Sequence, residues 1–477
     1  MATKYIPTIG IETHVQLNTK TKLFAGVGND ARSAPPNTLI SHICVGLPGA
    51  LPVLNKAAVD LVAKVAFALN TKPQKFSKFD RKHYFYPDLP KGYQISQYEQ
   101  PLIVGGHVHI DVDGERICVG ITRAHLEEDA GKNTHPPGAD YSLVDLNRAG
   151  TPLLEIVSDP DIHSAAAAKA YARELYLLMK YAGVTDGDMF HGHVRFDINI
   201  SVAQDPKKPG IRAEIKNLNS FRSVEGAVAY EIERQSELLD KGKKVIQETR
   251  GWDEAKQKTT SQRAKEEAHD YRYMPEPDVP PIELSDEYID KIEKQMPELP
   301  PMIRQRLAQV KIDIKVVEDI LDRSKAVNHI LQILESGGAE PARRAAFWFL
   351  QAEPPIEEDP DYQEPPVDVQ NIIKLSQMVS AGELSSTSAK TVFGKMLHSG
   401  GAPLKIAKDL KLLQVSDESA IEKIVAEVIA ANPQVAEDIK KGQSKAIGFL
   451  VGQVMAKSKG QANPGLAQKL IKKYLGV

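Results

Sequence analysis

Acidic residues and histidines alternate with apolar residues in two short segments that lie far apart in the chain. Glu12 and His14 stand two residues apart in the first segment, and His125, Glu127 and Asp129 share the same spacing in the second. Because side chains two residues apart point to one face of a β-strand, each segment predicts a strand that presents these groups together. A face so rich in carboxylates requires solvent or a bound cation to reduce their mutual repulsion.

Two later segments are predicted to extend this polar face. Residues 193–202 alternate strictly between polar and apolar side chains, and residues 212–216 repeat the pattern. The polar residues that would share a face there are Arg195, Asp197, Asn199, Arg212, Glu214 and Lys216. Carboxylates mixed with one or two histidines suit Mg²⁺ or Mn²⁺, and neighbouring arginine and lysine side chains suit phosphate oxygens. The pattern predicts a metal and phosphate site, and the alternative is the solvated face of an antiparallel sheet.

A third segment, residues 79–97, combines aromatic, basic and amide side chains with prolines. This composition is typical of a rigid loop that stacks on a nucleotide base or on an RNA end. The alternative is a small aromatic core beneath a long loop.

Composition limits the class of protein. The 477 residues carry a net charge of −3 and two cysteines, Cys44 and Cys118, which are too few for a disulfide framework or a four-cysteine zinc site. The sequence contains no P-loop, no Rossmann glycine motif and no helical zinc-protease motif. With no long apolar run and no leader-like N-terminus, we expect a cytoplasmic protein without a membrane segment.

Periodicity predicts an α+β fold. Strand-like alternation mixed with helical segments, but without a regular βαβ rhythm, extends over residues 1–295, and helical spacing dominates afterwards. Proline clusters and a Gly-Gly-Ala-Pro break then predict a helical domain over residues 296–402 and a helical tail over residues 403–477. From Lys440 to the end the chain has eight lysines and no acid. This basic tail predicts contact with a phosphate backbone, and a solubilising helical face is the alternative.

Nine segments of the chain together resemble one known family, the B subunits of the aspartyl/glutamyl-tRNA(Asn/Gln) amidotransferases, which belong to the GatCAB complex. The resemblance covers essentially the whole chain. The segments that carry it are residues 9–14, 79–97, 125–132, 145–157, 214–221, 247–250, 270–278, 448–455 and 459–464.

This resemblance implies a fold and a reaction. The first domain is expected to be an antiparallel-sheet cradle similar to the catalytic fold of glutamine synthetase and the guanidino kinases. The complex is expected to use ATP to phosphorylate the side-chain carboxylate of Glu-tRNA(Gln) or Asp-tRNA(Asn), and then to replace the phosphate with ammonia. An amidase-family A subunit would supply the ammonia from glutamine, and a small C subunit would complete a heterotrimer.

The resemblance also implies site residues. The catalytic residues, which would also lie around Mg²⁺, are Glu12, His14, Glu127, Glu128 and Glu214. The residues that would bind ATP or the substrate are Lys82, Tyr84, Arg148, Arg195, Asp197, Asn199, Lys216 and Asn219. The tail residues that would bind tRNA are Lys445, Lys457 and Lys459. Some relatives hold zinc with a Cys-x-x-Cys pair, but Ser41 stands here three residues before Cys44, so no zinc is predicted.

Two other classes of function remain open from the residues alone. A metal-dependent hydrolase could use the acidic and histidine groups to activate water. A non-catalytic scaffold could use the aromatic loop and the basic tail to hold RNA. The sequence does not predict whether Gln-tRNA(Gln), Asn-tRNA(Asn) or both are the products.

Overall fold

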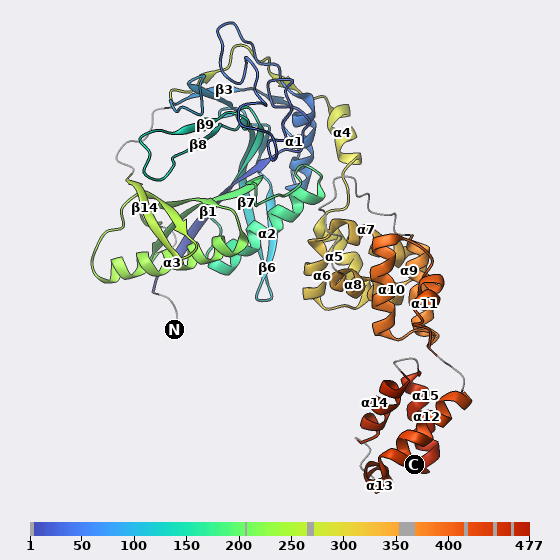
Figure 1. The fold of residues 1–477 in the computed structure, drawn as a ribbon. Coiled ribbons are helices and arrows are strands. Elements are labelled where there is room, and N and C mark those ends of the chain that lie inside the picture. The colour runs from blue at the N-terminus through green and yellow to red at the C-terminus, as the bar shows by residue number, and fades with distance from the viewer. Residues whose placement is uncertain are drawn as a thin grey trace. The chain divides into compact units, whose positions relative to one another are not determined.

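The computed structural model describes residues 4–205, 208–264, 271–352, 368–414, 418–441, 446–458 and 462–477. The chain divides into two compact units, Met1–Pro300 and Pro301–Val477. The first unit is built on a large sheet with helices, and the second is helical (Figure 1). This arrangement confirms the predicted α+β class. None of the described helices is both long and apolar enough to cross a membrane.

One large sheet dominates the first unit. Its strands, in the described part of the chain, are β1 (Ile6–Gln16), β3 (Asp80–His83), β4 (Tyr93–Ser96), β5 (Ile103–Val104), β6 (His107–Val112), β7 (Glu115–Glu128), β10 (Pro152–Ser158), β11 (Val194–Ala203), β12 (Ala213–Leu218), β13 (Glu248–Asp253), β14 (Lys258–Ala264) and β15 (Met274–Pro275). The order across the sheet is β14-β13-β12-β11-β1-β10-β7-β4-β3-β15, and β5 and β6 also pair with β7. Two small sheets pair β2 (Phe76–Ser77) with β16 (Ile282–Glu283), and β8 (Lys132–Thr134) with β9 (Leu143–Asp145).

The sheet is mixed, whereas the resemblance implied an antiparallel-sheet cradle. Strands β12 and β13 run parallel. Helix α3 (Phe221–Asp240) lies between them in the chain. Parallel neighbours require such a crossover. The helix returns the chain to the end of the sheet at which β12 begins, so β13 runs in the same direction as β12. The pairs that flank β1 are antiparallel.

The two faces of the sheet differ in chemistry. In β1, Ile9, Ile11, Thr13 and Val15 are buried, and the residues that alternate with them are partly exposed. Helices α2 (Ala165–Tyr181) and α3 lie side by side along the apolar face (Figure 1). The ring of Phe221 at the start of α3 packs 6.2 Å from the ring of Phe196 in β11. The polar residues of β1 and β11 therefore project from the face opposite these helices.

The first unit also contains the helices α1 (Lys56–Ala68) and α4 (Asp286–Lys294). At the junction and in the second unit lie α5 (Pro300–Leu307), a 3₁₀ turn (Ala308–Val310), α6 (Ile314–Leu321), α7 (Ser324–Gly337), α8 (Ala339–Gln351), α9 (Val369–Ser380), α10 (Ser386–Ser399), α11 (Pro403–Asp409), α12 (Glu418–Ala431), α13 (Pro433–Lys440), α14 (Ile447–Lys457) and α15 (Pro464–Leu475).

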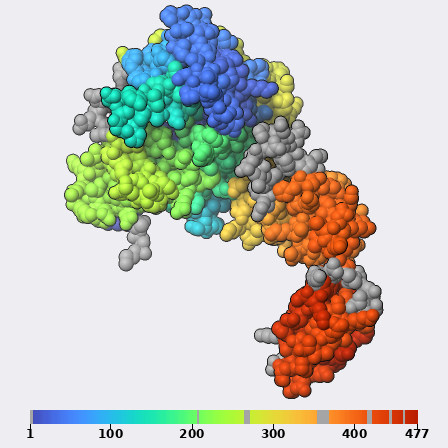
Figure 2. Space-filling view, viewed as in Figure 1, coloured from blue at the N-terminus to red at the C-terminus, as the bar shows by residue number. Residues whose placement is uncertain are grey.

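The helices α12–α15 pack around an apolar cluster of their own, which includes Val425, Leu450 and Ile471. Figure 2 shows them, in the red end of the colour range, in close mutual contact. The division of the helical part into domains 296–402 and 403–477 stays a prediction.

We predict that Ile198→Ala destabilises the protein by about 2–5 kcal/mol, because it opens a cavity between the sheet and its helices. Ile198 in β11 is fully buried. The matched control is Ile246→Ala, whose side chain is 66% exposed and leaves no cavity. Urea unfolding followed by circular dichroism measures both, and equal losses of stability in the two variants would contradict the packing described.

Candidate active site

The pairing of the central strands brings the predicted polar residues onto one face. Strand β1 lies between β11 and β10, with Glu12 opposite Asp197, and His14 opposite both Arg195 and Glu155. Glu155 in turn pairs with His125 on β7. The four strands thus present a continuous band of ionisable side chains on the face opposite α2 and α3. The alternation in the sequence predicted the parts on β1, β7 and β11, but not the part on β10.

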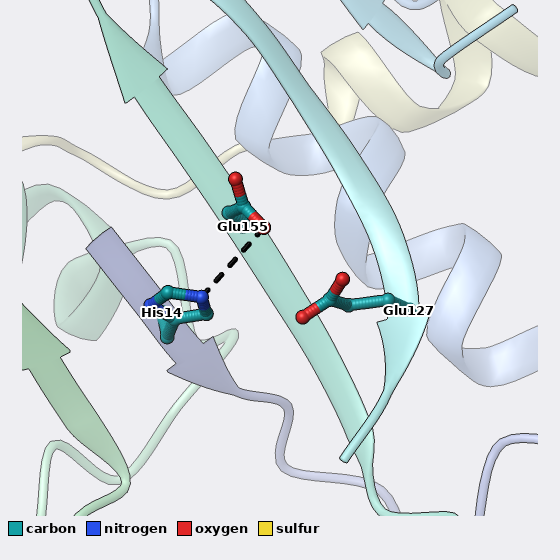
Figure 3. A group of neighbouring side chains, drawn as sticks. All are labelled: His14, Glu127 and Glu155. Atoms are coloured by element: carbon teal, nitrogen blue, oxygen red, sulfur yellow. Dashed lines mark ion pairs between the residues drawn. The ribbon is translucent and has the colours of Figure 1, made fainter. Parts of the chain in front are cut away.

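His14, Glu155 and Glu127 form the first group of potential metal ligands. One ligand atom from each lies within 4.8 Å of the others. Figure 3 shows the three side chains pointing toward one another from neighbouring strands. The His14 Nε2 atom lies 3.6 Å from a Glu155 oxygen, and His125 Nε2 lies 3.6 Å from Glu155 and 3.7 Å from Glu127. Glu155 was missing from the predicted site residues.

The histidines and carboxylates of this group stabilise one another's charged forms. Burial alone would lower the pKa of His14, but attraction by Glu155 outweighs it and raises that pKa. Burial alone would raise the pKa of Glu155, but the charges of His125 and His14 hold that pKa far below its ordinary range. The Nδ1 atoms of His14 and His125 are buried and have no hydrogen-bond partner in the described part of the chain. This group therefore offers carboxylate oxygens of the kind that hold cations, and its two Nδ1 atoms have unused hydrogen-bonding capacity.

Glu12, Asp197 and Glu214 form a second group on the same face, again with one oxygen from each within 4.8 Å of the others. Asn199 Nδ2 donates to Glu12 Oε1 at 2.8 Å. Lys216 Nζ lies 2.8 Å from Glu214 and 3.2 Å from Asp197. Burial raises the pKa of Glu12, and repulsion by neighbouring carboxylates adds to that effect. Lys216 thus offsets part of the negative charge of these three carboxylates.

Arg195 is held by a buried carboxylate beside the first group. Its guanidinium donates to both oxygens of Asp129, at 3.2 and 3.3 Å. Arg148 lies 3.4 Å from the same carboxylate, and it donates to the carbonyls of Ala130 and Gly131 at 3.0 and 2.7 Å. Burial would raise the pKa of Asp129, but the two arginines outweigh it and lower that pKa. Arg148 therefore supports the turn after β7 and is half-exposed.

Glu128 is not part of either group, although it was predicted to lie with Glu127 around the metal. Adjacent residues of a strand point to opposite faces. The Glu128 carboxylate forms a buried ion pair with Lys91 and accepts a hydrogen bond from the backbone N–H of Ile95 at 3.0 Å. On the same side of the sheet Cys44 is buried, and Lys22 Nζ lies 3.6 Å from its sulfur.

Lys82 and Tyr84 lie close to the first group, whereas Asn219 does not join it. Lys82 Nζ lies 4.8 Å from the ring centre of Tyr271, and its charge helps to lower the pKa of Glu155. Burial raises the pKa of Tyr84, and the charge of Glu127 adds to that effect. Asn219 is exposed in the turn between β12 and α3.

The predicted tail residues are described only in part. Lys457 at the end of α14 forms an ion pair with Glu427 at 2.6 Å. Lys445 and Lys459 lie outside the described residues. On α15, Lys469 and Lys472 are exposed, and neither forms an ion pair within the described part of the chain.

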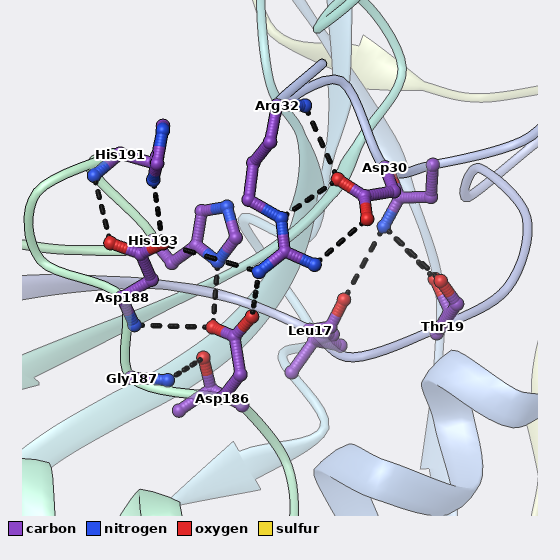
Figure 4. Close-up of polar contacts among 11 residues, drawn as sticks. Leu17, Thr19, Asp30, Arg32, Asp186, Gly187, Asp188, His191 and His193 are labelled. Atoms are coloured by element: carbon purple, nitrogen blue, oxygen red, sulfur yellow. Dashed lines mark hydrogen bonds and ion pairs between the residues drawn. The ribbon is translucent and has the colours of Figure 1, made fainter. Parts of the chain in front are cut away.

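A polar network fixes the ends of β1 and β11 beside the site (Figure 4). Arg32 donates to Asp30 at 2.9 Å and to Asp186 at 3.0 Å, and His193 contacts Asp186 through Nδ1 at 2.7 Å. The carbonyl of His193 accepts from the backbone N–H of Gln16 at 2.7 Å. The network therefore anchors the segment that leads into β11 and keeps that strand in register with β1.

Comparison with known proteins agrees with the resemblance inferred from the sequence. Residues 7–290 match the family described as the GatB/GatE catalytic domain, and residues 332–475 match the GatB domain. The chain is similar to the B subunit of the aspartyl/glutamyl-tRNA(Asn/Gln) amidotransferase from Desulfotalea psychrophila, with 45% identity over 98% of each chain. It is 44% identical to the corresponding B subunit from Persephonella marina, over 99% of this chain and 100% of that one. The chain therefore belongs to the family of the aspartyl/glutamyl-tRNA(Asn/Gln) amidotransferase B subunits.

Proposed function

We propose that this chain is the component of a tRNA-dependent amidotransferase that activates the side-chain carboxylate of Glu or Asp esterified to tRNA. ATP phosphorylates the carboxylate, and ammonia then displaces the phosphate to give Gln-tRNA(Gln) or Asn-tRNA(Asn). The observation that carries this proposal is the pair of ligand groups on one sheet face, in a chain related to the family's B subunits over nearly its whole length.

The chemistry explains why such a face is needed. A side-chain carboxyl group has a pKa of roughly 4, so it is ionised at neutral pH and is a poor electrophile. Phosphorylation provides a leaving group, and phosphoryl transfer depends mainly on positioning and on cations that offset developing negative charge. Arg195 and Lys82 would supply positive charge to phosphate oxygens, and Asn199 donates a hydrogen bond to the carboxylate of Glu12.

We further propose that His14, Glu127 and Glu155 hold Mg²⁺. The donor set of two carboxylates and one imidazole fits this hard cation, and the unpartnered Nδ1 atom of His14 is available if the ring reorients. When bound, the ion offsets negative charge on the phosphate oxygens of ATP. Glu12, Asp197 and Glu214 form a second candidate site, but Lys216 already neutralises part of its charge.

Several wider features belong to the same proposal. The sheet serves as a cradle like that of glutamine synthetase and the guanidino kinases. A glutaminase A subunit and a small C subunit complete a cytoplasmic heterotrimer, because an ammonia supply is required and neither ligand group contains a nucleophile for releasing it from glutamine. Residues 403–477 bind the tRNA.

Neither a hydrolase nor a passive RNA scaffold would couple ATP consumption to Glu-tRNA(Gln). That coupling, measured on the complete complex, therefore tests the function.

We predict that Glu155→Gln and His14→Ala reduce amidation of Glu-tRNA(Gln) by at least about 100-fold, because each removes a ligand that stabilises charge during phosphoryl transfer. The rate is measured with a supplied ammonium salt, so that the glutaminase step does not contribute. Chelation of Mg²⁺ is expected to abolish the reaction, and added Mg²⁺ is expected to restore it.

The matched control for these variants is Glu115→Gln, at the exposed start of the strand that also carries Glu127. It is expected to keep the full rate. Normal amidation by Glu155→Gln, or amidation that persists in excess chelator, would show that the proposed metal site is wrong.

For the tail, we predict that Lys469→Gln and Lys472→Gln weaken tRNA binding, because each removes a positive charge that can pair with a phosphate of the tRNA. The slope of log affinity against log salt is expected to decrease by about one for each lysine–phosphate pair removed. Affinity is measured by titration at several salt concentrations. Lys390→Gln, at an exposed lysine of α10, is the control and is expected to change neither quantity. An unchanged salt slope in both tail variants would remove α15 from the tRNA interface.

A further inference from the structure

Arg123 projects from the same face as the first ligand group but was not predicted as a site residue. It lies on β7, in the same alternation as His125 and Glu127. Its partner on β10 is Val157, which in turn lies opposite Glu12 on β1. Arg123 therefore lies on the same strand as Glu127 of the first ligand group, and two strands away from Glu12 of the second.

Unlike Arg195 and Lys216 on this face, Arg123 has no carboxylate partner among the described residues. Arg195 is paired with Asp129, and Lys216 with Asp197 and Glu214. The Nε atom of Arg123 is buried and has no hydrogen-bond partner in the described part of the chain. A buried donor without a partner is costly, and on a face so rich in acids the missing partner is a notable feature. An incoming anion would satisfy it.

An aromatic ring lies beside the guanidinium. The Arg123 Cζ atom lies 5.9 Å from the centre of the Tyr98 ring. Tyr98 is stacked on Tyr273, with ring centres 3.9 Å apart and an angle of 12° between the planes. The backbone N–H of Tyr98 donates to the buried carboxylate of Asp80 at 3.0 Å. A guanidinium beside a fixed ring keeps its N–H groups free and preorganised for a planar oxyanion.

The second ring of this aromatic pair, Tyr273, lies near the carboxylates of the first ligand group. Burial raises the pKa of Tyr273, and the charges of Glu127 and Glu155 add to that effect. Tyr273 therefore lies within electrostatic reach of both carboxylates.

We propose that Arg123 binds a phosphate group of the nucleotide, with its free N–H groups donating to phosphate oxygens. This inference rests on the proposed function. The nucleotide brings several negative charges onto a face that already carries the two ligand groups, and Arg123 is a cation of that face whose charge no described carboxylate offsets. Because Arg123 is only partly exposed, it fits a ligand that enters the site rather than a phosphate of the tRNA body.

The test uses the complete complex and measures ATP consumption that depends on Glu-tRNA(Gln). Arg123→Gln is expected to raise the KM for ATP by about 10- to 100-fold, the effect of losing a charge-assisted hydrogen bond. Arg123→Lys, which keeps the charge without the planar fork, is expected to lie between that variant and the wild type. Tyr98→Leu is expected to raise the same KM by a smaller factor, since it removes only the ring beside the guanidinium.

The matched control is Arg116→Gln, an exposed arginine earlier in β7 that lies opposite Asp111 in the adjacent hairpin strand. It is expected to leave the KM for ATP unchanged. Affinity for Glu-tRNA(Gln) is expected to be the same in all variants. An unchanged KM for ATP in Arg123→Gln, or an effect confined to the affinity for Glu-tRNA(Gln), would overturn the proposal.

Two measurements keep the result interpretable. Thermal unfolding and assembly of each variant separate a folding defect from a binding defect, and Arg123→Lys provides a conservative replacement if the glutamine variant is unstable. Failure of the wild-type complex to consume ATP in response to Glu-tRNA(Gln) would contradict the proposed function itself. A wild-type response with no change in Arg123→Gln would contradict only the role of Arg123.

Discussion

The antiparallel register of β1 between β10 and β11 is the constraint on which the site depends. It sets Glu12 against Asp197, and His14 against Arg195 and Glu155. Because side chains alternate between faces, a shift of one residue would turn these groups toward α2 and α3 and move Ile11 and Val15 into the polar face. Burial of the apolar half of β1 therefore fixes the positions of the ionisable half. Packing and the chemistry of the site are two consequences of the same register.

Such a band of charges is stable only because most of its members have partners. Glu155 lies between two histidines, Asp129 accepts from Arg195, and Lys216 joins two carboxylates. A buried charge without compensation costs several kcal/mol, whereas a hydrogen-bonded pair recovers much of that cost. The side chains whose partners are missing are then informative, because they mark where a ligand would complete the balance. The Nδ1 atoms of His14 and His125 and the Nε atom of Arg123 are of this kind in the described part of the chain.

The sequence predicted the site where local periodicity determines it. The alternation around Glu12, His14 and Asp197 was enough to place these residues on one face. Glu155 was missed because it is a single acid in an otherwise apolar strand, and only pairing with β1 and β7 brings it to His14 and Glu127. Glu128 follows Glu127 directly, so the alternation of a strand already placed it on the other face. The parallel pairing of β12 with β13 depends on the path of α3 across the sheet, and no local pattern specifies that path.

The two ligand groups differ in a way that bears on how substrates bind. The first group has histidines among its close neighbours, so a divalent cation can enter without displacing a lysine. The second already contains the ammonium group of Lys216, which occupies part of the space that a cation would use. Under the proposed function, binding of ATP alone would add negative charge to this face, where Arg123 and Lys82 have aromatic neighbours and no ion pair with a described carboxylate. A metal ion that enters with the nucleotide would offset the negative charge that the nucleotide adds to this face.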